Sequence, residues 1–169
     1  MCDWVCYLIA SLDSYATYVG ASNNQPKRLD HHNNCDPTIK RKGAKRTANQ
    51  TWIPVVIVSG FESKNACLSF EAGWKRLARR RNMERLFLLN EMSGLHLAYG
   101  GDQTWNRILD LLFFVCNLTI INEKFKLNVE QNYPMIPPDQ LKLTVFLEDS
   151  IQDLPWPYFV KVKLRTNVF

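Results

Sequence analysis

Five side chains in the first half of the sequence carry groups that could act together on a phosphate ester. They are two phenols, a guanidinium, an imidazole and a carboxylate, at Tyr7, Tyr18, Arg28, His32 and Glu71. A carboxylate is a preferred ligand of Mg²⁺, and a guanidinium binds phosphate oxygens in a bidentate manner. Taken singly, each residue has an ordinary explanation, as a half-buried strand tyrosine, a surface base, a helix-end cap or a solvated acid. Only the combination suggests metal-assisted chemistry.

Two predicted strands and a short helix must position the first four of these groups. Residues 5–12 are apolar and residues 17–21 are β-branched and aromatic, so the two runs predict a β-hairpin with one tyrosine on each strand. Pro26 suits the first turn of a helix that runs to about residue 33. Because Arg28 and His32 are four residues apart, they share one face of that helix.

The carboxylate lies on a longer helix that follows a central strand. Residues 34–50 are polar and basic and predict a loop, whereas residues 52–61 form the strongest strand pattern in the chain. Ser63 is a suitable N-cap for the next helix. Its buried stripe consists of apolar residues at helical spacing, namely Ala66, Phe70, Trp74 and Leu77. Glu71 falls beside this stripe, so we expect it at the rim of the core, where we also expect Tyr7.

The second half of the chain predicts one more helix and two strands. Residues 104–115 form the helix, and a proline-containing segment at 132–139 marks a boundary. Alternating apolar residues then predict strands at 141–147 and 158–165, the second with a basic, aromatic face made of Phe159, Lys161, Lys163 and Arg165. Lysines at an edge strand can also serve only to prevent aggregation. We divide the chain into a core at 1–85, a helical extension packed on it at 86–131, and a C-terminal strand element at 132–169.

The charge distribution indicates a polyanionic partner. The chain has 169 residues and a net charge of +5, and the basic residues gather at 27–46 and 75–85, which leaves the remainder acidic. The residues predicted to contact such a partner are Lys27, Lys40, Arg41, Lys42, Lys45, Arg46, Lys75, Arg79 and Arg80. Arg81 belongs to the same basic cluster.

The five cysteines are odd in number and contain no CxxC pair, which makes a disulfide framework or a zinc ribbon improbable. Reduced thiols predict an intracellular protein. No signal peptide is apparent, and the longest apolar run is too short and too interrupted to span a membrane. We therefore expect no membrane partner.

The spacing of these residues resembles the GIY-YIG endonuclease family. Val5-Cys6-Tyr7 and Tyr18-Val19-Gly20 correspond to the paired name motif, and an Arg, a His-Asn pair and a helical Glu follow at Arg28, His32-Asn33 and Glu71. One branch is similar in further detail, the catalytic subunit of the eukaryotic structure-specific endonuclease that works with a scaffold protein. The stretches that carry this likeness are 43–47, Trp52, 58–61 and 70–74. That branch ends in a RING-like zinc domain, but this chain has no cysteine after Cys116, so zinc binding and the scaffold partnership are not carried over.

The resemblance implies an α/β fold, with a small antiparallel sheet flanked by helices (the GIY-YIG fold) and an extra C-terminal helical or strand element. It also implies the roles of the site residues. Tyr7 would be the general base, and Glu71 would hold Mg²⁺ or Mn²⁺. Arg28 would bind the phosphate and lower the pKa of Tyr7, Tyr18 would hydrogen-bond a phosphate or water, and His32 would accept the phenolic proton or orient the ring.

The predicted function is a divalent-metal-dependent DNA endonuclease that hydrolyses phosphodiester bonds, with branched or flapped DNA as the expected substrate. The alternatives are a catalytically inactive DNA-binding module and a structural interaction protein. Glu71 disfavours the first of these, because a binding module needs no carboxylate amid basic charge. The expected location is the nucleus or a site of viral DNA replication, and a homodimer is an arrangement that the sequence leaves open.

Overall fold

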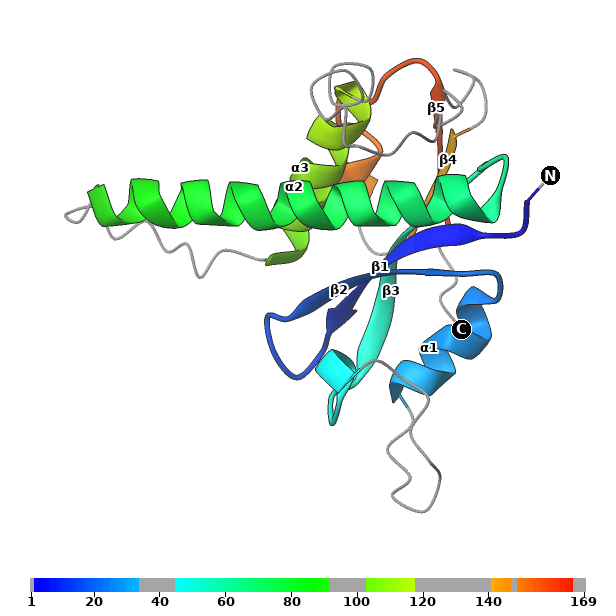
Figure 1. Ribbon diagram of the computed structural model, residues 1–169, viewed down its shortest axis with the longest axis horizontal. Helices are drawn as coiled ribbons and strands as arrows, with labels where there is room; N and C mark the ends of the chain where they lie inside the picture. The colour runs from blue at the N-terminus through cyan, green and yellow to red at the C-terminus, as the bar shows by residue number, and fades with distance from the viewer. Residues whose placement is uncertain (1, 34–44, 92–102, 118–140, 147–148, 166–169) are drawn as a thin grey trace.

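A mixed β-sheet organises the described part of the protein. The computed structural model describes residues 2–33, 45–91, 103–117, 141–146 and 149–165. The sheet has five strands in the order β2-β1-β3-β4-β5 (Figure 1). Their bounds are Val5–Ser11 for β1, Thr17–Ser22 for β2, Trp52–Ser59 for β3, Leu141–Val145 for β4 and Val160–Leu164 for β5. The predicted hairpin and the predicted central strand are therefore confirmed.

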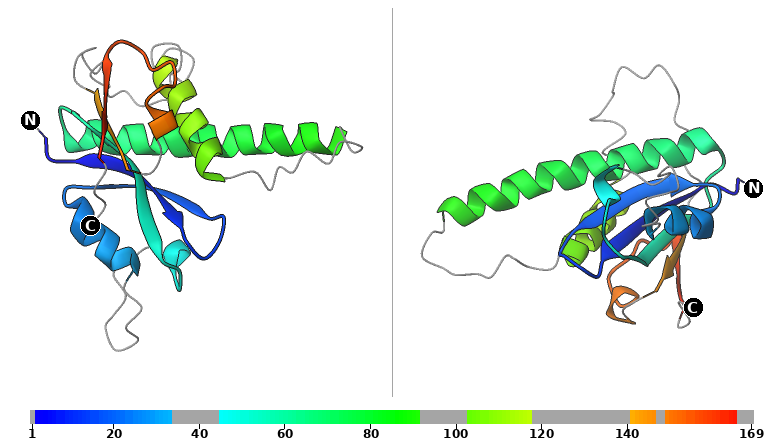
Figure 2. Two further views of the ribbon diagram at one scale, coloured as in Figure 1. Left: turned by 180° about the vertical axis from the view of Figure 1, so that it is seen from behind. Right: turned by 90° about the horizontal axis from the view of Figure 1, so that it is seen from below.

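In the described part of the chain, three α-helices flank the sheet, together with short 3₁₀ turns. They are α1 (Gln25–Asn33), α2 (Lys64–Glu91) and α3 (Gln103–Cys116), and the 3₁₀ turns are η1 (Lys45–Thr47) and η2 (Asp149–Ile151). The Ser63 hydroxyl accepts a hydrogen bond from the Ala66 backbone N–H at 3.1 Å, which confirms the predicted N-cap of α2. Helix α2 passes through residue 85, the predicted end of the core, and its second half extends beyond the sheet (Figures 1 and 2).

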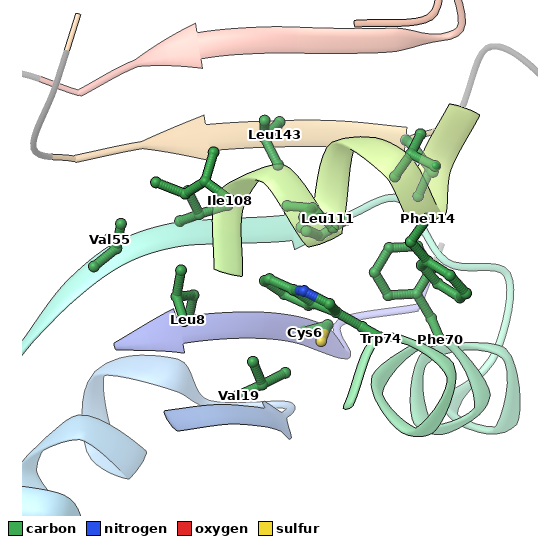
Figure 3. Packing of buried hydrophobic residues seen from close by; sticks show 14 of the residues in the cluster. Cys6, Leu8, Val19, Val55, Phe70, Trp74, Ile108, Leu111, Phe114 and Leu143 are labelled. Atoms are coloured by element: carbon green, nitrogen blue, oxygen red, sulfur yellow. The ribbon is translucent and has the colours of Figure 1, made fainter. Parts of the chain in front are cut away.

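One face of the sheet carries the main hydrophobic core. Alternate residues of the strands, such as Leu8, Val56 and Leu143, belong to this core. Figure 3 shows Leu8 and Leu143 facing α2 and α3. Trp74 and Phe114 join the two helices within this core. The opposite face carries a smaller cluster around Tyr7, Ile9 and Trp52, against which Leu29 of α1 packs. The predicted α/β fold, a small sheet flanked by helices, is confirmed.

The edge of the sheet departs from the expected antiparallel pattern. Strands β2, β1, β3 and β4 are antiparallel to their neighbours, but β5 runs parallel to β4. A parallel pair needs a crossover of about a dozen residues or more. The connection at 146–159 provides that length, and it includes η2, whose Ile151 is fully buried in the main core.

A buried ion cluster ties α2 to α3. Asp110 is completely buried, with one carboxylate oxygen 2.6 Å from Arg107 Nη1 and the other 3.2 Å from Arg81 Nε. Arg107 also donates a hydrogen bond to the Asn82 side chain at 2.6 Å. The Arg81 guanidinium lies 4.7 Å from the centre of the Phe113 ring.

Within the described ranges, no helix combines the length and apolar character of a membrane span.

Candidate active site

Tyr7 is the centre of a polar cluster on the face of the sheet that α1 covers. Its hydroxyl lies 2.9 Å from His32 Nε2, and His32 Nδ1 lies 2.8 Å from Thr47 Oγ1. All three side chains are buried, with 1% or less of their surface exposed. They form a chain of hydrogen bonds from β1 through α1 to η1. Such a chain can carry a proton away from the phenol.

Tyr18 and Arg28 complete this cluster from two further elements. The Tyr18 ring centre lies 6.4 Å from that of Tyr7 and 5.0 Å from that of His32. Arg28 stands one helical turn before His32 on α1, and it hydrogen-bonds the Tyr7 side chain. The predicted common helix face of Arg28 and His32 therefore points both residues at the same phenol.

Glu71 approaches the cluster from α2. Its side chain is 17% exposed, and its carboxylate lies 2.5 Å from Lys75 Nζ, one turn further along the helix. Lys75 Nζ in turn lies 5.3 Å from the centre of the Tyr18 ring. The negative charge of Glu71 also acts on Tyr7, whose pKa it raises. The predicted position of Glu71, at the rim of the core, is confirmed.

The expected exposure of Tyr7 is wrong, and burial outweighs the expected lowering of its pKa by Arg28. The sequence predicts Tyr7 at the rim of the core with a lowered pKa, but its ring is buried between β1 and α1. Burial is the largest cause of a pKa raised well above the ordinary value of about 10. The hydrogen bond and the charge of Arg28 lower the pKa of Tyr7, whereas the charges of Tyr18 and Glu71 raise it.

Gly20 leaves the room that the Tyr7 ring occupies. It is the direct partner of Tyr7 across the β1–β2 pair. A Cβ at position 20 would lie 2.5 Å from the Tyr7 hydroxyl and 2.8 Å from Cε1 of Tyr18. A side chain of any size would therefore displace the Tyr7 phenol.

Two further contacts hold α1 and η1 in place. The Trp52 backbone N–H donates to Asn33 Oδ1 at 2.6 Å, and Asn33 Nδ2 donates to the Trp52 carbonyl at 2.9 Å. The Trp52 indole N–H donates to the Thr47 carbonyl at 3.1 Å. Thr47 is the last residue of the basic stretch 43–47, and the sequence alone predicts no role for it. Only the fold brings it to His32.

The site residues fit a metal ion that keeps most of its water. Among the described residues, no three His, Cys, Asp or Glu side chains gather as a closed metal site. Mg²⁺ is commonly held by one or two carboxylates together with water and substrate phosphate. Glu71, partly exposed beside the tyrosine cluster, suits that role, and Mn²⁺ accepts the same oxygen ligands.

Most described residues of the predicted DNA-contact set are exposed. These are Lys27, Lys45, Arg46, Arg79 and Arg80, whereas Lys75 is half-buried beside Glu71. Lys40, Arg41 and Lys42 lie outside the described residues. Arg81, from the same basic cluster, is instead engaged with Asp110. Its role is to join α2 to α3.

Comparisons with known proteins show which sequences this chain is similar to. The family described as GIY-YIG catalytic domain matches residues 3–84. An uncharacterized protein of Acanthamoeba polyphaga mimivirus is 56% identical over 160 residues, which cover 95% of each chain.

Structure-specific endonuclease subunits of fungi match the N-terminal half. That of Pyrenophora tritici-repentis is 38% identical over 85 residues, covering 48% of this chain and 22% of the relative. That of Aspergillus terreus is 40% identical over 76 residues, covering 43% and 18%. The chain thus spans about a fifth of these two fungal proteins.

Proposed function

This chain belongs to the GIY-YIG family of endonucleases, and from that premise we propose that it hydrolyses phosphodiester bonds in branched or flapped DNA with one divalent metal ion. The observation that supports this most is the meeting of five side chains from four elements. Tyr18 from β2 and Arg28 and His32 from α1 adjoin the phenol of Tyr7 on β1, and the charge of Glu71 on α2 acts on it. A protein that only binds DNA has no need of this arrangement.

In the proposed reaction, Tyr7 and His32 together remove the proton of the attacking water. Because the pKa of Tyr7 is raised, its phenol is protonated near neutral pH and needs an acceptor for its own proton. His32 Nε2, at 2.9 Å, is that acceptor. The water proton passes to the Tyr7 oxygen while the phenolic proton passes to His32. The hydroxide forms the new P–O bond, the bond to the leaving oxygen breaks, and that oxygen takes a proton from solvent.

Arg28 and Glu71 serve the phosphate in this proposal. The Arg28 guanidinium neutralises charge on the non-bridging oxygens and favours the phenolate form of Tyr7. Glu71 would hold the metal ion, which when bound supplies charge stabilisation to the phosphate. Before a metal ion binds, the ammonium group of Lys75 holds the Glu71 carboxylate at the edge of the site.

The proposed substrate class rests on the fungal relatives, which are named structure-specific endonuclease subunits. The likeness covers the catalytic half of this chain. An enzyme that selects DNA structure must recognise the shape and the backbone of the DNA more than base edges. The exposed lysines and arginines near α1 and along α2 suit backbone contact.

The test is to incubate the purified full chain with duplex, flap and four-way-junction DNA, with Mg²⁺, with Mn²⁺ and with a chelator. We expect cleavage of the flap or the junction only when a metal ion is present, without any partner protein. Binding without cleavage under all conditions would favour the inactive DNA-binding module. Absence of both binding and cleavage would favour the structural interaction protein.

A further inference from the structure

The register of the sheet places the C-terminal strands on the same face as the candidate active site. Tyr7 is the direct partner of Ile57, Ile57 of Thr144, and Thr144 of Lys163. Direct partners on neighbouring strands point to the same face of a sheet. Lys163 therefore shares its face with Tyr7, and the opposite face carries the core that packs on α3 (Figure 3).

The next row along the sheet adds two more lysines to this face. Ser59 is the partner of Lys142, and Lys142 is the partner of Lys161. Lys142, Lys161 and Lys163 are all exposed, and we refer to them as the β4–β5 basic patch. Arg165 continues the patch, with its guanidinium 5.8 Å from the centre of the Phe146 ring. Phe159, which the sequence predicts on the basic face, packs against the main core instead.

The charges of this patch lack compensation within the described part of the chain. Lys142 and Lys161 are directly opposed, and like charges in that arrangement destabilise a sheet. No ion pair between described residues involves any of the three lysines. Helix α1 packs against β2 and β3 and leaves these lysines open to solvent. An uncompensated row of ammonium groups favours a polyanion.

We propose that the β4–β5 basic patch binds the phosphate backbone of the DNA arm beside the cleavage point. This inference rests on the proposed function, because it assigns a second contact surface to the same substrate. Three strand spacings separate β1 from β5, which is about 14 Å at about 4.8 Å per strand. DNA advances about 3.4 Å per base pair, so the patch meets phosphates about four base pairs from the reacting one.

The patch lies outside the part of the chain that the family matches, residues 3–84. Strands β4 and β5 thus extend the catalytic sheet with a surface that the family match does not include. The parallel order of β5 matters here. It puts Lys161 opposite Lys142, so that both strands present lysines in one continuous area.

The test compares variants of matched charge in the full chain. Lys161→Gln with Lys163→Gln removes two positive charges from the patch. Gln103→Glu with Gln152→Glu changes the net charge by the same amount at exposed positions of α3 and the η2 connection, away from the lysine face. DNA affinity is measured for a flap substrate and for a duplex as a function of salt concentration.

Each lost phosphate contact lowers the slope of log affinity against log salt by about 0.9. Between about 50 and about 200 mM salt, the parent is therefore expected to lose about tenfold more affinity than the Lys161→Gln, Lys163→Gln variant. The Gln103→Glu, Gln152→Glu control should keep the slope of the parent. Equal slopes in the parent and the lysine variant would overturn the proposal.

A third variant separates DNA contact from protection of the sheet edge. Lys161→Glu with Lys163→Glu keeps the edge strand charged and soluble but repels phosphate. We expect this variant to bind DNA more weakly than the parent and to remain monomeric to the same degree as the parent. Unchanged affinity in this variant would leave edge protection as the role of the lysines. If the parent neither binds nor cuts DNA, the proposed function itself fails. If the parent cuts DNA but the lysine substitutions do not change its DNA affinity, only the inference about the β4–β5 basic patch fails.

Discussion

Asp110 pairs with Arg81 of α2 and with Arg107 of its own helix α3, and its replacement by Asn should weaken the fold more than the loss of an exposed ion pair does. Asp110 is fully buried, and Arg107 is only 7% exposed. Removing one partner of a buried ion pair leaves an uncompensated charge, which costs about 3–5 kcal/mol. For a chain of this size, each kcal/mol lowers the melting temperature by about 2–4 °C, so a fall of about 6–20 °C is expected.

The assay is thermal unfolding followed by circular dichroism at neutral pH, with Glu84→Gln as the matched control. Glu84 pairs with Arg80 on the same helix, but the two side chains are 57% and 67% exposed. Exposed pairs on one helix contribute about 0.5 kcal/mol or less. If Asp110→Asn and Glu84→Gln shift the melting temperature by the same small amount, the buried cluster does not join the helices as described. Arg81→Ala should likewise lower stability while keeping the salt dependence of DNA binding.

Three further predictions concern the tyrosine cluster. Burial raises the pKa of Tyr7, so above about pH 10 the folded protein still holds the phenolic proton that the unfolded chain loses. The contribution of Tyr7 to the free energy of unfolding is therefore complete below about pH 10 and decreases above it. The difference in unfolding free energy between the parent and Tyr7→Phe should therefore fall as the pH rises above about 10 in urea titrations, and a constant difference would contradict the burial argument. Gly20→Ala should displace the Tyr7 hydroxyl and lower single-turnover cleavage by up to about 100-fold with unchanged DNA affinity; full activity would show that the phenol need not stay in place. Thr47→Val should lower cleavage about tenfold, the scale of one buried hydrogen bond, and Thr47→Ser should restore it; equal rates in both variants would exclude a role for the hydroxyl.

Local patterns in the sequence predict much of the fold. The hairpin, the central strand and the N-cap at Ser63 follow from residue types within a few positions of each other. The i, i+4 spacing of Arg28 and His32 predicts their common face in the same way, and the helical stripe predicts where Glu71 lies. These features depend on backbone periodicity, which the sequence displays directly.

Long-range packing decides the features that the sequence does not predict. Tyr7 is buried because α1 covers its strand, and this reverses the expected shift of its pKa. Thr47 reaches His32 only because Trp52 and Asn33 hold η1 and α1 together. Arg81 belongs to a basic run in the sequence, but it meets Asp110 of a helix that begins far along the chain. The parallel direction of β5 follows from its pairing with β4, which residue types within β5 do not determine.

The most direct test of the central claim is single-turnover cleavage of flap DNA by Glu71→Gln at saturating enzyme across a Mg²⁺ titration, with DNA affinity measured beside it. Glu84→Gln is the control, because it removes one exposed carboxylate from the same helix. We expect Glu71→Gln to bind DNA as tightly as the parent or slightly more tightly, since a negative charge leaves a basic surface, and to show no cleavage at any Mg²⁺ concentration. Cleavage by Glu71→Gln at the rate of the parent and of Glu84→Gln would contradict the role of Glu71 in holding the metal ion.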